Sequence, residues 1–224
     1  MNRLAVFDCD GTLVDSCGNI FSALSGAFSD HGLSVPPPDV TRRVIGLSLV
    51  EAIATLVPNE DRDSHVLLAE SYKRHFQLAR FEGRVEEPLF EGIAELLDTL
   101  EAEGWLLAVA TGKSDRGLAH CLDCHGYAKR FISLQTADRH PSKPHPSMVN
   151  QAIADAGAAP ETTVVIGDTA FDMAMAVAAG ATGIGAAWGY HGTDELLAAG
   201  AAAVAVAPLD ILPLLPRGEE RLYG

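Results

Sequence analysis

Long apolar runs are missing from this chain of 224 residues. No segment reaches the roughly 20 consecutive apolar residues that a membrane-spanning helix requires, so the composition predicts neither a membrane protein nor a membrane partner. The apolar stretch at residues 4–7 breaks at once into an acidic segment that begins with Asp8. This is unlike the apolar region and cleavage site of a secretory signal peptide, and we expect a cytoplasmic protein.

Basic residues are also scarce. The chain has 16 lysines and arginines against 30 aspartates and glutamates, which gives a formal net charge of −14. Such a chain repels the phosphate backbone of a nucleic acid, so we expect no nucleic-acid partner. If the substrate is itself a phosphorylated anion, its attraction has to come from a local positive site made of a metal ion, a lysine and backbone amides.

Cysteines are few, and we expect no disulfide among them. The four are Cys9, Cys17, Cys121 and Cys124, which remain free thiols in a reducing compartment. The segment from Cys121 to His125 matches the short pattern of covalent haem attachment, and with His120 it is compatible with zinc. Because it falls within a predicted helix, and no signal peptide is expected, we interpret it as a packing feature.

The pattern that is present is an alternation of short apolar runs with amphipathic runs from residue 89 onward, typical of a parallel sheet with crossover helices. The predicted strands are residues 4–7, 106–110, 132–134, 164–166, 183–186 and 204–207. The predicted helices between them are residues 91–101, 114–125, 146–156 and 171–179. We therefore expect the α/β class, with a Rossmann-like three-layer core and a mainly parallel sheet.

The stretch after the first strand looks entirely helical. Apolar residues repeat at helical spacing from Ile20 to Phe28 and again from Val50 to Leu56. A run of three prolines followed by Asp39, the expected N-cap, separates two of these helices. The expected domains are a discontinuous α/β core, residues 1–15 and 88–224, and an inserted helical cap, residues 16–87.

Two carboxylates, Asp8 and Asp10, follow the first predicted strand, at the edge where open α/β sheets bind ligands. Such crowding needs a counter-charge, and Mg²⁺ suits hard oxygen ligands. On its own, the pair is equally compatible with an acidic turn that ends a strand.

Three further segments each follow a predicted strand. Thr111 and Gly112 offer a hydroxyl and an amide to an anion, and Lys143 offers a cation in a loop next to proline. Asp168 and Asp172 add carboxylates after another strand. Phosphoryl transfer depends mainly on positioning and charge neutralisation, which this combination can supply.

The four segments, in this order, resemble the signature motifs of the haloacid dehalogenase superfamily over essentially the whole chain. The resemblance implies that Asp8 attacks phosphorus to form an aspartyl phosphate, while Asp10 protonates the leaving oxygen and then activates water. It implies Mg²⁺ ligation by Asp8, the backbone carbonyl of Asp10 and Asp168, with Asp172 outside the ligand shell or supporting Lys143. The implied phosphate contacts are Asp8, Cys9, Asp10, Thr111, Gly112 and Lys143.

The presence of Asp10 narrows the choice among the branches of the superfamily. Dehalogenases and phosphonatases of this superfamily lack the second aspartate, so Asp10 disfavours both. The segment from Asp8 to Ser16 and the position of the helical insert resemble phosphoglycolate phosphatases, which implies hydrolysis of a small phosphorylated metabolite. A phosphomutase keeps both aspartates and stays open as an alternative, as does a non-catalytic phosphometabolite-binding module.

The helical insert would then act as a lid that gives closure and selectivity. Its loop at residues 42–48 is the expected contact to the leaving group. Arg43 could pair with a carboxylate or a second phosphate of the substrate, or lie on a solvated helix face. We expect a monomer or a homodimer.

Overall fold

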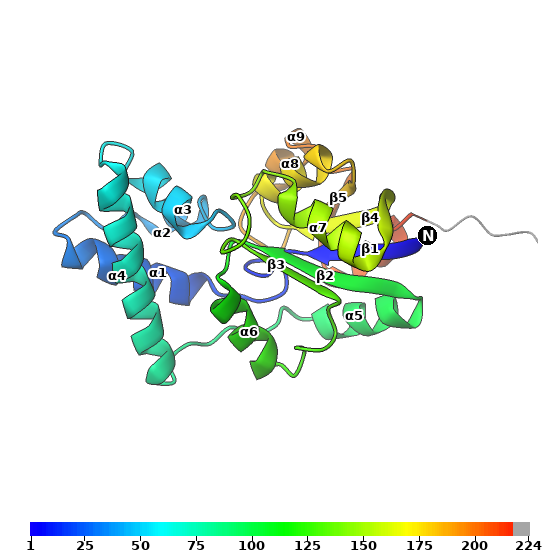
Figure 1. Ribbon diagram of the computed structural model, residues 1–224, viewed down its shortest axis with the longest axis horizontal. Coiled ribbons are helices and arrows are strands. Elements are labelled where there is room, and N and C mark those ends of the chain that lie inside the picture. Colours follow the sequence, from blue (N-terminus) through cyan, green and yellow to red (C-terminus); the bar gives the residue numbers. More distant parts are fainter. Residues whose placement is uncertain (217–224) are drawn as a thin grey trace, which may run out of the picture.

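The computed structural model describes residues 1–216 and contains a six-stranded sheet in the order β3-β2-β1-β4-β5-β6, with all neighbours parallel (Figure 1). Its strands are β1 (Asn2–Phe7), β2 (Trp105–Thr111), β3 (Ser133–Thr136), β4 (Ala158–Gly167), β5 (Thr182–Ala186) and β6 (Ala203–Ala205). The predicted α/β class and parallel sheet are confirmed.

Helices cover both faces of this sheet, and they do so because β1 is apolar on both of its faces. Ala5 and Phe7 pack in one buried cluster with α5 (Ile93–Ala102) and α6 (Asp115–Cys124). Leu4 and Val6 point the other way, into a second cluster with α7 (Ser147–Ala156) and α8 (Ala170–Ala178). The chain ends its described part with α9 (Thr193–Ala198) and the short helix η1 (Pro208–Leu214). Successive residues of a strand face opposite sides, which produces the three layers.

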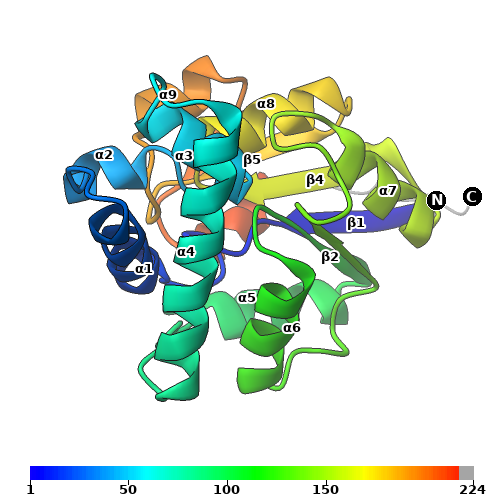
Figure 2. The same cartoon turned by 60° about the vertical axis from the view of Figure 1, so that its left-hand side comes forward.

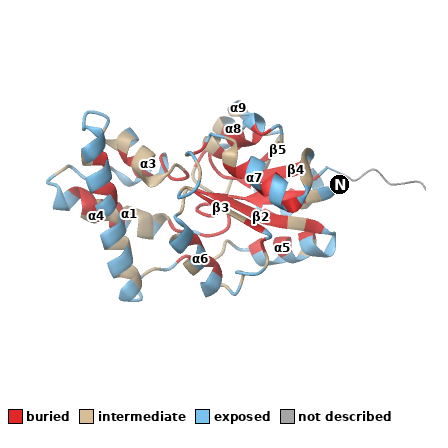
Figure 3. Cartoon of the chain, in the orientation of Figure 1, coloured by how far each residue is buried: buried red, intermediate tan, exposed pale blue. Residues whose placement is uncertain are grey.

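Four helices lie to one side of the sheet, beyond the carboxyl ends of its strands (Figures 1 and 2). They are α1 (Cys17–Asp30), α2 (Pro38–Arg42), α3 (Leu49–Leu56) and α4 (Arg62–Phe81). Leu24, Phe28, Ile53 and Leu68 give this group a buried cluster of its own, visible in Figure 3 as a patch of buried residues apart from the sheet. The predicted helices are therefore present, while their status as a separate cap domain stays a prediction.

One local prediction in this segment is wrong. Asp39 lies in the first turn of α2, and Pro37 occupies the N-cap position. Proline suits the start of a helix, because its fixed φ matches the helix and its missing N–H is not needed there.

The chain enters and leaves the helical segment at one place. The amide of Asp15 donates to the carbonyl of Pro88 at 2.9 Å, and Val14 forms an antiparallel bridge with Leu89. The two connections are therefore hydrogen-bonded to each other, at the end of the loop that follows β1 and shortly before α5.

The helical segment also contacts the core through the loop between α2 and α3. A Cβ atom on Gly112 would lie 2.5 Å from the carbonyl oxygen of Leu47, so only glycine allows this approach. The amide of Ser48 donates to Ser142 at 2.8 Å. Arg43 forms an exposed ion pair with Glu195 of α9, so in this structure it serves the contact between the two parts of the chain.

Within residues 1–216, no helix combines the length and the apolarity needed to cross a lipid bilayer.

The packing of α5 against the sheet should provide a large share of the stability. Leu97→Ala removes a fully buried side chain, so we expect the free energy of unfolding to fall by about 2–5 kcal/mol in denaturant titrations. The matched change Leu78→Ala, at a side chain that is 51% exposed, should alter it by about 0.5 kcal/mol or less. Equal effects of the two variants would contradict this account of the core.

Candidate active site

The residues singled out in the sequence meet at the carboxyl edge of the sheet. Asp8 follows β1, Thr111 ends β2 and Asp168 follows β4. The strands β2, β1 and β4 are parallel neighbours, and Phe7 of β1 is in register with Val109 and Ile166. Their ends therefore lie side by side, and Lys143 reaches the same place from the loop between β3 and α7.

Lys143 links two of the carboxylates. Its Nζ lies 2.8 Å from Asp8 Oδ1 and 2.7 Å from Asp172 Oδ1, and all three side chains are buried. Burial opposes the ammonium charge, but Asp172 and Asp8 outweigh it and raise the pKa of Lys143. Lys143 is therefore a permanent cation, and Asp172 supports it.

The two oxygens of Asp8 have different environments. Oδ1 accepts hydrogen bonds from Lys143 and from the Cys9 amide, at 2.6 Å for the latter. Oδ2 is buried and has no hydrogen-bond partner among the described residues. Burial raises the pKa of Asp8 to about 7, against the lowering effect of Lys143 and with a further raising effect of Asp172. The fold thus orients this carboxylate and leaves one oxygen unpaired.

Asp168 is held by the loops around it. Its Oδ1 accepts from the Thr12 hydroxyl at 2.8 Å and its Oδ2 from the amide of Tyr190 at 2.9 Å. Burial, with the nearby charges of Asp8 and Asp172, raises the pKa of Asp168 well above its ordinary value. The turn at Gly11 has a φ of +87°, and a Cβ there would lie 2.3 Å from Asp168 Oδ2, so glycine is needed for both reasons.

These carboxylates fit a hard divalent cation. Asp8, Asp168 and Asp172 each offer an oxygen within 4.8 Å of the others, and they are the one such cluster of acidic, histidine or cysteine residues in the described chain. Among the residues described, only one ammonium, that of Lys143, stands against these three carboxylates. A cation such as Mg²⁺, which prefers oxygen ligands, would offset the remaining negative charge. The side chain of Asp10, whose backbone carbonyl was the expected ligand, is not part of this cluster.

Asp10 instead belongs to a second charged group. Its carboxylate lies 2.8 Å from Lys113 Nζ and accepts a hydrogen bond from the Ser16 hydroxyl. Lys113 also pairs with Glu87 at 2.6 Å, and these three charged side chains are at most 10% exposed. Burial opposes the charge of Lys113, but Asp10 and the neighbouring groups raise its pKa well above the ordinary value. The position of Asp10 therefore depends on Lys113.

Sequence reasoning missed this group. Lys113 directly follows Thr111 and Gly112 and could have been found from its place at the end of β2. Glu87 has no local signal, because its partner is 26 residues away. Thr111 itself is fully buried, and its hydroxyl accepts from the Lys113 amide at 3.2 Å.

The cysteines and histidines of the α6 segment do not converge on a site. All four cysteines are free. Cys121 is buried beside Cys9, with 3.9 Å between the sulfurs, whereas Cys124 is exposed. The His125 ring bonds the backbone carbonyl of Glu87 at 2.7 Å. These contacts are packing and local hydrogen bonds, in line with the interpretation of this segment as a packing feature.

Comparison with known proteins identifies the family of this chain. Residues 5–186 match the family model described as haloacid dehalogenase-like hydrolase. The chain belongs to this family. The expected resemblance is thereby confirmed, and the hydrolase is a phosphatase according to relatives that match most of its length.

Two curated relatives and one solved structure illustrate the match. The chain is 39% identical to a probable phosphatase IndB of Dickeya dadantii over 205 residues, which are 89% of this chain and 87% of the relative. It is 27% identical to a phosphoglycolate phosphatase of Pasteurella multocida, over 84% of this chain and 87% of that one. A hydrolase structure from Pseudomonas syringae superposes with a TM-score of 0.83 at 27% identity, covering 96% of this chain and 97% of the other.

Removal of the Lys113 ammonium should disturb both stability and turnover. Lys113→Met leaves Asp10 and Glu87 without their buried partner, and we expect a loss of about 3–5 kcal/mol in unfolding free energy. Because Asp10 is then less well positioned, kcat should fall by about tenfold to a hundredfold. The control Lys129→Met, at an exposed lysine, should change neither. Wild-type stability and kcat in Lys113→Met would contradict the role given to this pair.

The raised pKa of Asp8 predicts a pH-dependent stability of the metal-free protein. The pKa of Asp8 is 3.8 in the unfolded chain and about 7 in the folded protein. The contribution of Asp8 to the free energy of unfolding is therefore fully present below pH 3.8 and is lost as the pH rises through about 7. Metal-free Asp8→Asn should therefore melt at a higher temperature than the wild type in alkaline buffer, and the difference should vanish in acid.

The exposed Asp123 provides the control, since Asp123→Asn should show no such pH-dependent difference. Added Mg²⁺ should stabilise the wild type more than Asp8→Asn at alkaline pH. If Asp8→Asn is the less stable protein at every pH, burial of the Asp8 charge is not the unfavourable feature described above.

Proposed function

We propose that this phosphatase is a Mg²⁺-dependent phosphomonoester hydrolase that acts on a small phosphorylated metabolite through an aspartyl phosphate on Asp8. The observation that carries the proposal is the Asp8 carboxylate. One of its oxygens is fixed by Lys143 and the Cys9 amide, while Oδ2 is buried and has no partner in the described part of the chain. An oriented carboxylate with a free oxygen is what an attacking nucleophile requires.

Positive charge for the phosphoryl group would come from this chain and from the cation. Lys143 stays protonated between Asp8 and Asp172, so it can attract phosphoryl oxygens without giving up its own proton. Thr111, Gly112 and the backbone around Cys9 complete the proposed phosphate contacts. When bound by Asp8, Asp168 and the Asp10 carbonyl, Mg²⁺ would neutralise charge on the phosphoryl oxygens. Asp172 keeps its role as the partner of Lys143.

Asp10 would move the protons. In the first step Asp8 bonds to phosphorus, the ester oxygen departs with the electron pair of its bond, and Asp10 gives that oxygen a proton. In the second step Asp10 takes a proton from water, which attacks the phosphorus and releases phosphate from Asp8. Ser16 and Lys113 hold Asp10 in place between the two steps.

The helical segment would act as the lid over this chemistry. Its loop between α2 and α3 touches the core at Gly112 and Ser142, directly beside Thr111 and Lys143. Closure at this point would exclude water from the first step. We further propose a monomeric or homodimeric cytoplasmic enzyme. A phosphomutase would use the same residues, with a sugar hydroxyl in place of water.

Release of inorganic phosphate from a panel of phosphorylated metabolites tests the proposal. We expect release that needs Mg²⁺, stops with chelator, and is abolished in Asp8→Asn. In Asp10→Asn it should fall by about 10²–10⁴-fold, the usual contribution of general acid and base catalysis.

Each result bears on one claim. Release that persists in Asp8→Asn would refute the nucleophile, and wild-type turnover in Asp10→Asn would refute the proton donor. Phosphate transfer to an added sugar phosphate without free phosphate would identify a mutase. A folded, Mg²⁺-loaded protein without turnover on any substrate would favour the binding module.

A further inference from the structure

A cavity of about 520 Å³ extends from Asp10 into the space between the helical segment and the core. Its walls come from the helices α1 to α4, the loop between α2 and α3, the segment after β2 with the start of α6, and the segment after β3. This volume lies in the range of pockets that bind small organic molecules. A leaving group of two or three carbon atoms would leave most of it unfilled, so the cavity has room for a larger one.

Basic side chains outnumber acidic ones on the cavity wall, although the chain has a net charge of −14. Five basic and two acidic residues line it, in sequence order Asp10, Arg62, Lys73, Arg80, Lys113, Arg116 and Asp138. Lys113, Arg62 and Lys73 have acidic partners. Arg80 and Arg116 form no ion pair within the described part of the chain.

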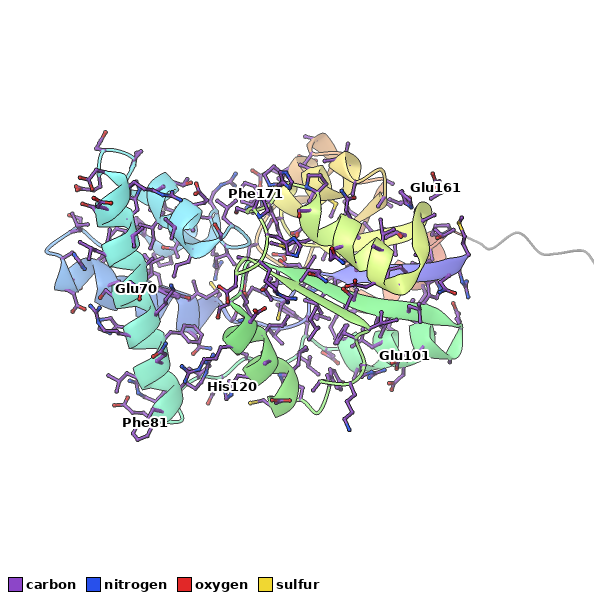
Figure 4. The ribbon with its side chains drawn as sticks, viewed as in Figure 1. Glu70, Phe81, Glu101, His120, Glu161 and Phe171 are labelled. Carbon is purple, nitrogen blue, oxygen red and sulfur yellow. The ribbon has the colours of Figure 1, made fainter. Side chains whose placement is uncertain are left out.

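Arg80 is part of an ordered stripe on one face of α4. Tyr72, Phe76 and Arg80 follow one another at intervals of four residues, which places them on the same side of the helix, and all three line the cavity. The rings of Tyr72 and Phe76 have centroids 5.8 Å apart, and the Arg80 guanidinium carbon lies 5.4 Å from the Phe76 centroid. Figure 4 shows α4 with its side chains, between the labelled Glu70 and Phe81.

Two polar groups on the cavity wall have no hydrogen-bond partner within residues 1–216. Arg80 Nε is buried without a hydrogen bond among the described residues. The hydroxyl of Thr41, a fully buried residue that also lines the cavity, is likewise unpaired. A buried donor without a hydrogen bond is unfavourable. An acceptor on the molecule that fills the cavity would satisfy it.

We infer that the substrate of this enzyme is a phosphomonoester whose leaving group has a flat, unsaturated part that ends in an acidic group, and that the Tyr72–Phe76–Arg80 stripe binds it. The inference rests on the proposed function, since it places the phosphoryl group at Asp8. The flat part stacks on the two rings. The acidic group pairs with Arg80, whose planar guanidinium is suited to a carboxylate.

Three probe esters test the inference at constant leaving-group chemistry. Cyclohexylmethyl, benzyl and para-carboxybenzyl phosphate all release a primary alcohol, but they differ in flatness and in charge. The expected order of kcat/KM in the wild type is para-carboxybenzyl, then benzyl, then cyclohexylmethyl. Arg80 should make the first about tenfold better than the second. Equal values for the three esters would overturn the inference.

Variants assign each preference to its side chain. Arg80→Gln should remove the advantage of the carboxylate, mainly through KM, and Phe76→Leu should remove the advantage of benzyl over cyclohexylmethyl. The matched control is Arg74→Gln, on the exposed side of the same helix and outside the cavity, which should keep both ratios. If the kcat/KM ratios between the esters persist in Arg80→Gln and Phe76→Leu, another part of the cavity recognises the leaving group. That result would refute the role of the stripe.

Failure of the proposed function gives a different result. If no ester releases phosphate, binding of the alcohols alone, followed by NMR, still tests the stripe. Tighter binding of para-carboxybenzyl alcohol than of benzyl alcohol, lost in Arg80→Gln but kept in Arg74→Gln, would support the inference without catalysis. Equal binding of the two alcohols would overturn it.

Discussion

The contact on which this structure depends is the buried ammonium of Lys143 between Asp8 and Asp172. A buried ammonium without a carboxylate beside it would be strongly unfavourable, so Lys143 depends on the other two side chains. Each comes from a different part of the chain: the end of β1, the loop before α7, and the first turn of α8. Their pairing therefore fixes how these elements meet, and among the residues that the structure describes it leaves Asp8 Oδ2 without a partner.

A second buried pair extends this arrangement toward the helical segment. Lys113 joins Asp10, which belongs to the loop after β1, to Glu87 at the end of the connection that returns from α4. The proposed nucleophile and the proposed proton donor thus have separate cations, one from the core loops and one from the end of β2. Through Lys113, the carboxylate of Asp10 is linked to Glu87, which lies where the helical segment joins the core.

Much of the fold could be predicted from the sequence, because β1, β2 and the second half of β4 are apolar runs that end at Asp8, Thr111 and Gly167. Asp8, Thr111, Lys143 and Asp168 follow from the same logic, since the ends of parallel strands share one edge. The pairs of Lys113 with Glu87 and of Arg43 with Glu195 could not be predicted, because they join distant residues without any local pattern. β4 begins before its apolar run, at Ala158, where it pairs with Asn2 across a shift in register.

The hydrogen bond between Asp15 and Pro88 bears on how the helical segment can change during evolution. Because the two ends of the helical segment touch, this attachment sets no particular length for what lies between them. A segment of a different size can take the same two attachment points without moving β1 or α5. The core therefore offers a fixed attachment site for an inserted segment. Selectivity for a new substrate can be acquired by exchanging the insert while the chemistry at the sheet edge stays the same.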